Sequence, residues 1–384
     1  MQLFFESLFN GVAIGSVLLM AALGLAIVFG LMGVINLAHG ELIMLGAYTT
    51  YVVQLIFKLP ALAPFYSLYV LVAIPFAFIV SGVVGILLER TVIRRLYGSP
   101  LETLLATWGV SLILQQFVRS VPMAQAVGLV LALILGFGLP LLIPSHLIQG
   151  SRARLVRAGS WSFSALCGVL LAGELASQIP RIARADARNV DVTAPQWMRG
   201  GLELSEMTFP IPRLVIIVMT IVAVFAVTWF LNRSAWGLRI RAVTQNRSMS
   251  DCLGISTDTV DVLTFGIGSG LAGVAGVAVS LLGSVGPNVG GSYIVGCFMV
   301  VVLGGVGNLY GTVLASFAIG WLTDLIGAGR LLSAWPDMPS PLGVIVNFFA
   351  TTSMAQVMVF ALIVVFLQFR PAGLFPQKGR MVES

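Results

Sequence analysis

The sequence predicts an all-α protein, a polytopic bundle of transmembrane helices with about nine to eleven crossings, some of them broken or re-entrant. The composition supports this, because 58% of the 384 residues are hydrophobic, 9% are charged and the mean hydropathy is +1.01. A soluble domain carries roughly 25% charged residues. A charge at the bilayer centre is costly, so a chain this poor in charge suits a surface in contact with lipid.

Long apolar runs give the crossings. A spanning helix needs about 20 mostly apolar residues, and there is no ten-residue alternation of the kind that barrel strands show. The runs fall at 8–31, 37–57, 66–88, 103–121, 124–143, 161–178, 213–231, 262–283, 293–305, 308–328 and 342–369. Many of the 42 glycines lie inside these runs at small-residue spacing, which predicts closely packed helices.

Basic clusters between the runs predict the orientation, because arginine and lysine gather on the cytoplasmic side. The clusters are Arg90, Arg94 and Arg95; Arg152, Arg154 and Arg157; Arg233, Arg239, Arg241 and Arg247; and Arg370, Lys378 and Arg380. With all four inside, the crossings alternate and the C-terminus is cytoplasmic. Counting back puts the N-terminus outside, and loop 180–212 also falls outside despite its four arginines.

The first interruption of an apolar run, residues 33–41, holds Asn36, His39 and Glu41 between glycines. Ionisable side chains at membrane depth indicate function, and a broken helix exposes backbone groups that can bind a solute. The alternative is structural: His39 and Glu41 bond to one another or cap a helix near the interface. Three polar residues of this kind are too few to predict a metal site.

A second interruption, residues 303–311, contains Gly304, Gly305 and Asn308. Interrupted helices in the two halves of a transporter point to a binding site near the midplane. The alternative is a tightly packed corner that touches no solute.

Thr103, Thr107 and Ser111 recur every four residues and therefore form one polar stripe on a helix. Hydroxyl groups on one face can line a polar pathway, or they can bond to their own helix backbone. We include Asn36, His39, Glu41, Thr107, Ser111, Gly304, Gly305 and Asn308 in the predicted translocation pathway.

The segment 232–261 is the longest loop assigned to the cytoplasm, and it predicts a short helix from Ala242 to Leu253 that ends at Gly254. Such a helix suits docking to a soluble partner; the alternative is a solvated connector. The residues expected to couple the chain to that partner are Arg241, Gln245, Asn246, Arg247, Asp251 and Gly254.

The sequence excludes several classes of function. It has no phosphate-binding loop of the GxxxxGK[ST] type and no HExxH or GxSxG motif, so we expect neither ATP hydrolysis by this chain nor enzymatic catalysis. The three cysteines lack metal or redox spacing, so no metal and no cofactor is expected. The basic residues are spread over many loops and do not form a nucleic-acid surface.

Four segments together carry a family resemblance: residues 24–41, 237–255, 304–311 and 370–375. The chain resembles the branched-chain amino acid family of ABC permeases, of which these segments are the N-terminal signature, the cytoplasmic coupling loop, the glycine motif and the C-terminal ending. Within that family, residues 41–51, 101–111, 241–247 and 283–288 most resemble the permease subunit of urea transporters. Residues 122–180 depart from the pattern as an inserted pair of membrane helices.

The resemblance implies one transmembrane permease domain over residues 1–384, in the plasma (inner) membrane. It also implies four kinds of partner: the lipid bilayer, a second homologous permease, two cytoplasmic ATP-binding subunits and an external solute-binding protein. The substrate expected from it is urea. Branched-chain or other amino acids, or a channel or secondary carrier acting alone, stay open as alternatives.

Overall fold

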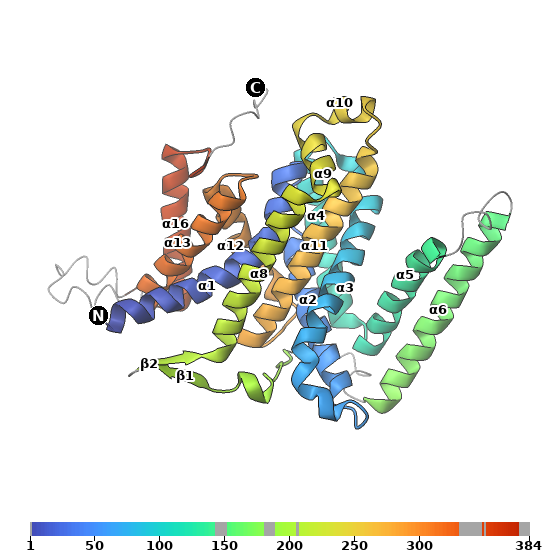
Figure 1. Ribbon diagram of the computed structural model, residues 1–384, viewed down its shortest axis with the longest axis horizontal. Coiled ribbons are helices and arrows are strands. Elements are labelled where there is room, and N and C mark those ends of the chain that lie inside the picture. Colours follow the sequence, from blue (N-terminus) through green and yellow to red (C-terminus); the bar gives the residue numbers. More distant parts are fainter. Residues whose placement is uncertain are drawn as a thin grey trace.

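The computed structural model describes residues 2–142, 152–179, 189–204, 207–329, 348 and 351–375. The all-α prediction is confirmed: helices dominate these ranges, and one small β-hairpin is present among them (Figure 1). The long helices are α1 (Gln2–Ile27), α2 (His39–Phe57), α3 (Tyr69–Thr91), α4 (Pro100–Ser120), α5 (Met123–Leu142), α6 (Arg152–Gln178), α8 (Ile211–Arg233), α11 (Thr257–Leu282), α12 (Val289–Gly304), α13 (Leu309–Gly327) and α16 (Thr352–Phe369).

The number of crossings agrees with the sequence. In the described residues, eight helices are long and apolar enough to cross a membrane, and three shorter apolar helices lie at 123–136, 289–304 and 354–369. The predicted run 342–369 begins in residues outside the described ranges, and its described part is α16.

Helix α11 lies at the centre of the bundle. In the most apolar 18-residue stretch of α11, 89% is buried inside the bundle. The corresponding shares are 17% for α4 and 22% for α8. Glycine makes this burial possible, because a Cβ added at Gly46 would lie 2.1 Å from the carbonyl oxygen of Gly273, and one added at Gly24 would lie 2.1 Å from that of Gly268. The backbones of α1 and α2 therefore approach α11 in the way that small residues allow in membranes.

Helix α1 does not continue directly into α2. It widens into a π-helical turn, η1 (Val28–Met32), and then stops at Gly33, whose φ of +70° is left-handed. Residues 33–38 connect to α2, which starts at His39. The predicted first interruption is thus a real break between two helices.

The other long helices surround this centre. Helices α5 and α6 pack on each other, since a Cβ at Gly128 would lie 2.3 Å from the carbonyl oxygen of Gly168, and Figure 1 shows the pair to one side of the bundle. The hairpin of β1 (Gly201–Leu204) and β2 (Met207–Pro210) lies at the bottom of Figure 1. Two short helices, α9 (Ala235–Gln245) and α10 (Arg247–Cys252), lie at the top, and the end of α16 also points to the top.

One prediction for the loop 232–261 is wrong. The helix expected from Ala242 to Leu253 is divided at Asn246, whose backbone is extended with φ −154° and ψ 102°. The Oδ1 atom of Asn246 accepts a hydrogen bond from the Met249 amide at 2.9 Å and so caps a new helix. The predicted stop at Gly254 is confirmed, with φ +80°.

Candidate functional site: a polar break between α1 and α2

The three polar residues of the first break are fully buried. Asn36 and His39 have no exposed surface, and Glu41 is 1% exposed. Asn36 Oδ1 accepts from the Ala38 amide at 3.1 Å, which closes the turn that starts α2. Polar groups at this depth need partners, so the contacts of each side chain show its role.

His39 and Glu41 do not bond to one another, so one of the two structural alternatives for them is excluded, and both residues lie in the first turn of α2. His39 Nε2 lies 3.0 Å from the carbonyl oxygen of Ala21 in α1. A carbonyl oxygen only accepts, so Nε2 carries a proton, and in the neutral ring Nδ1 is then an acceptor. His39 therefore ties the start of α2 to the middle of α1.

Glu41 is bound by helix α4. Its Oε1 atom accepts from Ser111 Oγ at 3.0 Å and from Gln115 Nε2 at 2.7 Å. Thr107 Oγ1, one turn before Ser111, accepts from the Leu37 amide at 3.1 Å. The polar stripe predicted on 103–111 thus faces the first break.

The stripe bonds partly to the backbone before and within its own helix and partly to the first break. Thr103 donates to the carbonyl oxygens of Ser99 and Leu96, at 2.9 and 3.0 Å, and so caps the turn at the start of α4. Thr107 and Ser111 contact the break between α1 and α2. Gln115 completes this contact, and the sequence signal for it was its position four residues beyond Ser111.

Three buried atoms at the break lack a hydrogen-bond partner within the described parts of the chain: Asn36 Nδ2, His39 Nδ1 and Glu41 Oε2. They are one donor and two acceptors. Buried polar atoms without partners are uncommon and need an explanation such as a ligand or water. Each of these three atoms therefore has hydrogen-bonding capacity that the described residues leave unused.

The second break packs against the π-helical turn that precedes the first, since a Cβ added at Gly30 would lie 2.5 Å from the Cα atom of Gly307. Asn308 caps α13 by accepting from the Gly311 amide at 3.2 Å, and the backbones of Gly304 and Gly311 are in close contact. Gly305, with φ +101°, packs against the C-terminal segment, where the Leu374 amide donates to the Leu303 carbonyl oxygen at 2.8 Å. The structure does not bring Gly304, Gly305 and Asn308 into contact with Glu41.

Asn308 instead faces the coupling loop. It lines a cavity of about 430 Å³ between α1, α8, α9 and α13, together with Arg241 and Gln245. The structure thus places one predicted pathway residue beside two predicted coupling residues.

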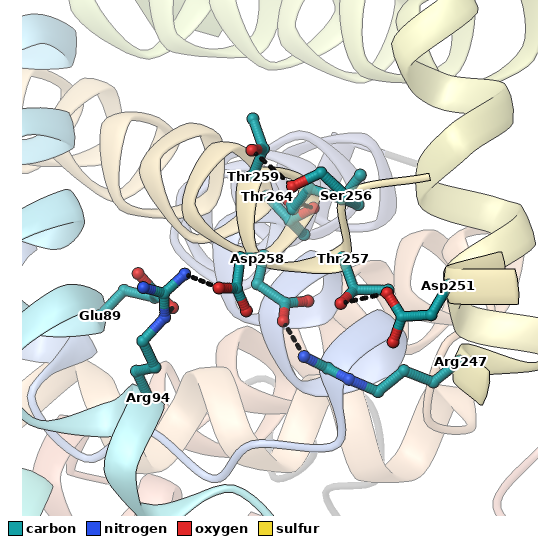
Figure 2. Close-up of polar contacts among 11 residues, drawn as sticks. Glu89, Arg94, Arg247, Asp251, Ser256, Thr257, Asp258, Thr259 and Thr264 are labelled. Carbon is teal, nitrogen blue, oxygen red and sulfur yellow. Dashed lines mark hydrogen bonds and ion pairs between the residues drawn. The ribbon is translucent and has the colours of Figure 1, made fainter. Parts of the chain in front are cut away.

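The remaining coupling residues lie over the start of α11. Arg247 pairs with Asp261 at 2.5 Å and lies over the Tyr97 ring at 5.1 Å. Asp251 accepts from Thr257 Oγ1 at 2.9 Å (Figure 2). Sequence reasoning missed Tyr97, Thr257 and Asp261.

Large apolar side chains are exposed on α9, on α10 and at the residue that follows α10. Leu238 is 62%, Met249 59% and Leu253 74% exposed. Arg239 stacks on Trp236 at 4.7 Å, and Arg241 is also exposed. Helices α9 and α10 therefore present apolar and cationic side chains together, which is typical of protein interfaces.

The features above define a membrane permease: a bundle of spanning helices, a buried polar break, and a short pair of helices exposed at one end. The family model for the permease component of branched-chain amino acid transport systems matches residues 7–367, and the chain belongs to this family. It is therefore a multi-pass protein of the inner membrane and an ABC-type transport component rather than an enzyme.

Several curated proteins are similar to the chain. The high-affinity branched-chain amino acid permease LivH of Salmonella typhimurium is 27% identical over 346 residues, 88% of this chain and 90% of LivH. BraD of Pseudomonas aeruginosa, a permease of the same kind of system, is 25% identical over 97% of this chain and 95% of BraD. The autoinducer 2 import permease LsrC of Yersinia pestis is 26% identical over 38% of this chain and 44% of LsrC. No solved structure matches the chain.

Proposed function

We propose that this chain is the membrane-spanning subunit of an ATP-driven importer, and that the solute it moves is urea. The observation that carries the proposal is the set of three unpartnered buried atoms at the break between α1 and α2. Asn36 Nδ2 is a donor, whereas His39 Nδ1 and Glu41 Oε2 are acceptors.

Urea complements this set. Its carbonyl oxygen accepts from an amide such as Asn36, and its N–H groups donate to a carboxylate and to an imidazole nitrogen. Urea is neutral, so it asks for no ion pair at membrane depth. Because the three atoms are buried, solute can reach them only if the bundle opens. We expect α4 to move away from Glu41 when solute enters and to close again after the solute is bound.

An amino acid is the second candidate, and one observation favours it: LivH and BraD are named for branched-chain amino acids. A zwitterion asks for a cationic or helix-N-terminal partner for its carboxylate as well as an anionic one for its ammonium group. Glu41 could bind the ammonium group. None of the three unpartnered atoms belongs to a cation, and the partner that the break offers a carboxylate is the start of α2; urea needs neither, and for that reason we place it first.

A membrane subunit of an ATP-driven importer works together with partner proteins. We expect a second permease of the same family, two ATP-binding subunits docked on α9 and α10, and an external solute-binding protein. The coupling residues of the proposal are Arg241, Gln245, Asn246, Arg247, Asp251 and Gly254. ATP-driven closure of the docked subunits would move these helices and switch access to the break between the two sides of the membrane.

Uptake of labelled urea tests the proposal directly. Cells that carry the partner proteins are compared with and without this chain, with unlabelled leucine as competitor. Urea uptake that requires the chain and ignores leucine supports the assignment. Leucine uptake that requires the chain, without urea uptake, overturns the substrate and keeps the importer class. The absence of both, with no ATPase co-purifying, overturns the importer.

A further inference from the structure

Helices α10 and α11 are joined by contacts that cross the hinge between them. The hinge is the segment Leu253–Ser256, which contains Gly254 with φ +80°. A glycine in this conformation, between two helices, is a natural bending point. The two contacts are the Arg247–Asp261 ion pair at 2.5 Å and the Thr257–Asp251 hydrogen bond at 2.9 Å.

We call these two contacts, Arg247–Asp261 and Thr257–Asp251, the joint. The joint is stronger than a surface contact. Asp261 is 3% exposed, so its pair with Arg247 is shielded from water on one side. The guanidinium group of Arg247 also stacks on Tyr97, outside α10 and α11. Bending at Gly254 would break both contacts across the hinge.

A second ion pair connects the start of α11 to the segment that follows α3. Arg94 pairs with Asp258 at 2.7 Å, and its Nε atom lies 3.9 Å from the buried carboxylate of Glu89 (Figure 2). The start of α11 is therefore held from two directions, by α10 and by the segment after α3.

Helix α11 connects this joint to the polar break. From Asp261 it runs into the bundle and reaches the break between α1 and α2. A Cβ at Gly24 would meet both Gly268 of α11, at 2.1 Å, and the His39 ring, at 2.9 Å. Further along, the carbonyl oxygen of Ile43 lies 2.2 Å from a Cβ built on Gly276. With contacts this tight, α11 cannot shift without moving the backbone on which His39 and Glu41 are placed.

We propose that α10 and α11 move as one rigid lever, and that Arg247, Asp251, Thr257 and Asp261 are positioning residues that transmit motion at the coupling helices to the polar break. The proposal rests on the proposed function, because the motion is attributed to docked ATP-binding subunits. Without the joint, α10 would bend at Gly254 and the motion would be lost there.

Two measurements on the full chain test the lever. The variants are Arg247→Ala and Asp261→Asn, and the control is Arg95→Ala, another exposed arginine, which lies outside the joint and outside α9 and α10. The first measurement is amide hydrogen exchange of α10 in lipid nanodiscs, which does not depend on any solute. Loss of the joint is expected to raise exchange over residues 247–253 roughly tenfold, while α11 stays protected and the control stays unchanged. Unchanged exchange in both variants would overturn the joint.

The second measurement is solute moved per ATP hydrolysed, with the complex reconstituted in vesicles. Both variants are expected to assemble with the ATPase and to hydrolyse ATP, yet to move roughly fivefold less solute per ATP. The charge exchange Arg247→Asp with Asp261→Arg should recover part of this loss. A normal ratio, or loss of assembly in the variants alone, would overturn the lever. If the wild-type chain binds no ATPase and moves no solute, while exchange responds as expected, the joint stands and the proposed function fails.

Discussion

At the scale of single residues, Glu41 shows how the bundle keeps a carboxylate inside the membrane. A buried acid is tolerated only when its charge or its hydrogen-bonding capacity is satisfied. Ser111 and Gln115 satisfy one oxygen, and the second oxygen has no partner in the described residues. The half-satisfied state is what a binding group needs before its ligand arrives.

Glu41→Gln should therefore separate binding from folding. The amide keeps a carbonyl oxygen for Ser111 and Gln115, so the α2–α4 contact survives. It also turns the free acceptor into a donor, so a urea N–H group loses its partner. We expect urea uptake to fall roughly tenfold or more, as for the loss of a hydrogen bond to a charged group.

The matched control is Glu102→Gln, an exposed glutamate at the start of the same helix α4. It should leave uptake within the error of the assay. Glu41→Ala should in addition lower stability by about 1–3 kcal/mol, because the buried Ser111 and the half-buried Gln115 lose their acceptor. Thermal unfolding in detergent measures this. If Glu41→Gln took up urea normally, Glu41 would be structural.

At the scale of elements, helix contacts depend on individual glycines rather than on overall hydrophobicity. Gly46→Ala would place a methyl group 2.1 Å from the carbonyl oxygen of Gly273, an atom of the backbone that cannot rotate away. Overpacking of this kind costs about 1–3 kcal/mol. We expect a lower unfolding midpoint for Gly46→Ala in mixed detergent.

Gly109→Ala is the control for this change. Gly109 is also inside a membrane helix, and nothing lies within 4 Å of a Cβ built there. Its substitution should be neutral or slightly stabilising, because alanine favours helix. Equal effects of the two substitutions would contradict the close approach of α2 and α11.

The end of α10 allows another prediction at this scale. Alanine at Gly254 would have to adopt φ +80°, a left-handed conformation that costs roughly 1–2 kcal/mol. Gly254→Ala should therefore fray α10, seen as faster hydrogen exchange over residues 247–252. Gly291→Ala, in α12 with open space around it, should not. Unaltered exchange in Gly254→Ala would mean that this turn tolerates a side chain.

Some features of these elements could be predicted from the sequence, and others could not. Hydropathy and helical period were enough to predict the spanning helices, the first break and the polar stripe on α4, because these signals are local. The partner of the stripe was not predictable: Ser111 and Glu41 are 70 residues apart, and only packing brings them together. The division at Asn246 had a local signal, since asparagine is a strong N-cap residue, but the absence of proline and glycine outweighed it. Arg247–Asp261 depended on how the loop folds back.

At the scale of the whole molecule, the alternation of crossings predicts which side faces the cytoplasm. Helices α9 and α10 and the end of α16 lie at one end of the bundle, and the β-hairpin lies at the other (Figure 1). The arginines of the coupling loop belong to the first end, and the charge rule predicts that this end is cytoplasmic.

The native cysteines make this orientation measurable. Cys252 is exposed on α10, whereas Cys297 is buried. A membrane-impermeant maleimide should label Cys252 in inverted vesicles and leave it unlabelled in intact spheroplasts. Leu202→Cys, with Cys252 replaced by serine, should give the opposite result, because Leu202 is exposed on the β-hairpin. Labelling of Cys252 from outside would reverse the whole topology, and α9 and α10 would then be out of reach of a cytoplasmic ATPase. The coupling proposal therefore depends on the side of the membrane from which Cys252 can be labelled, and this can be measured without knowing the solute.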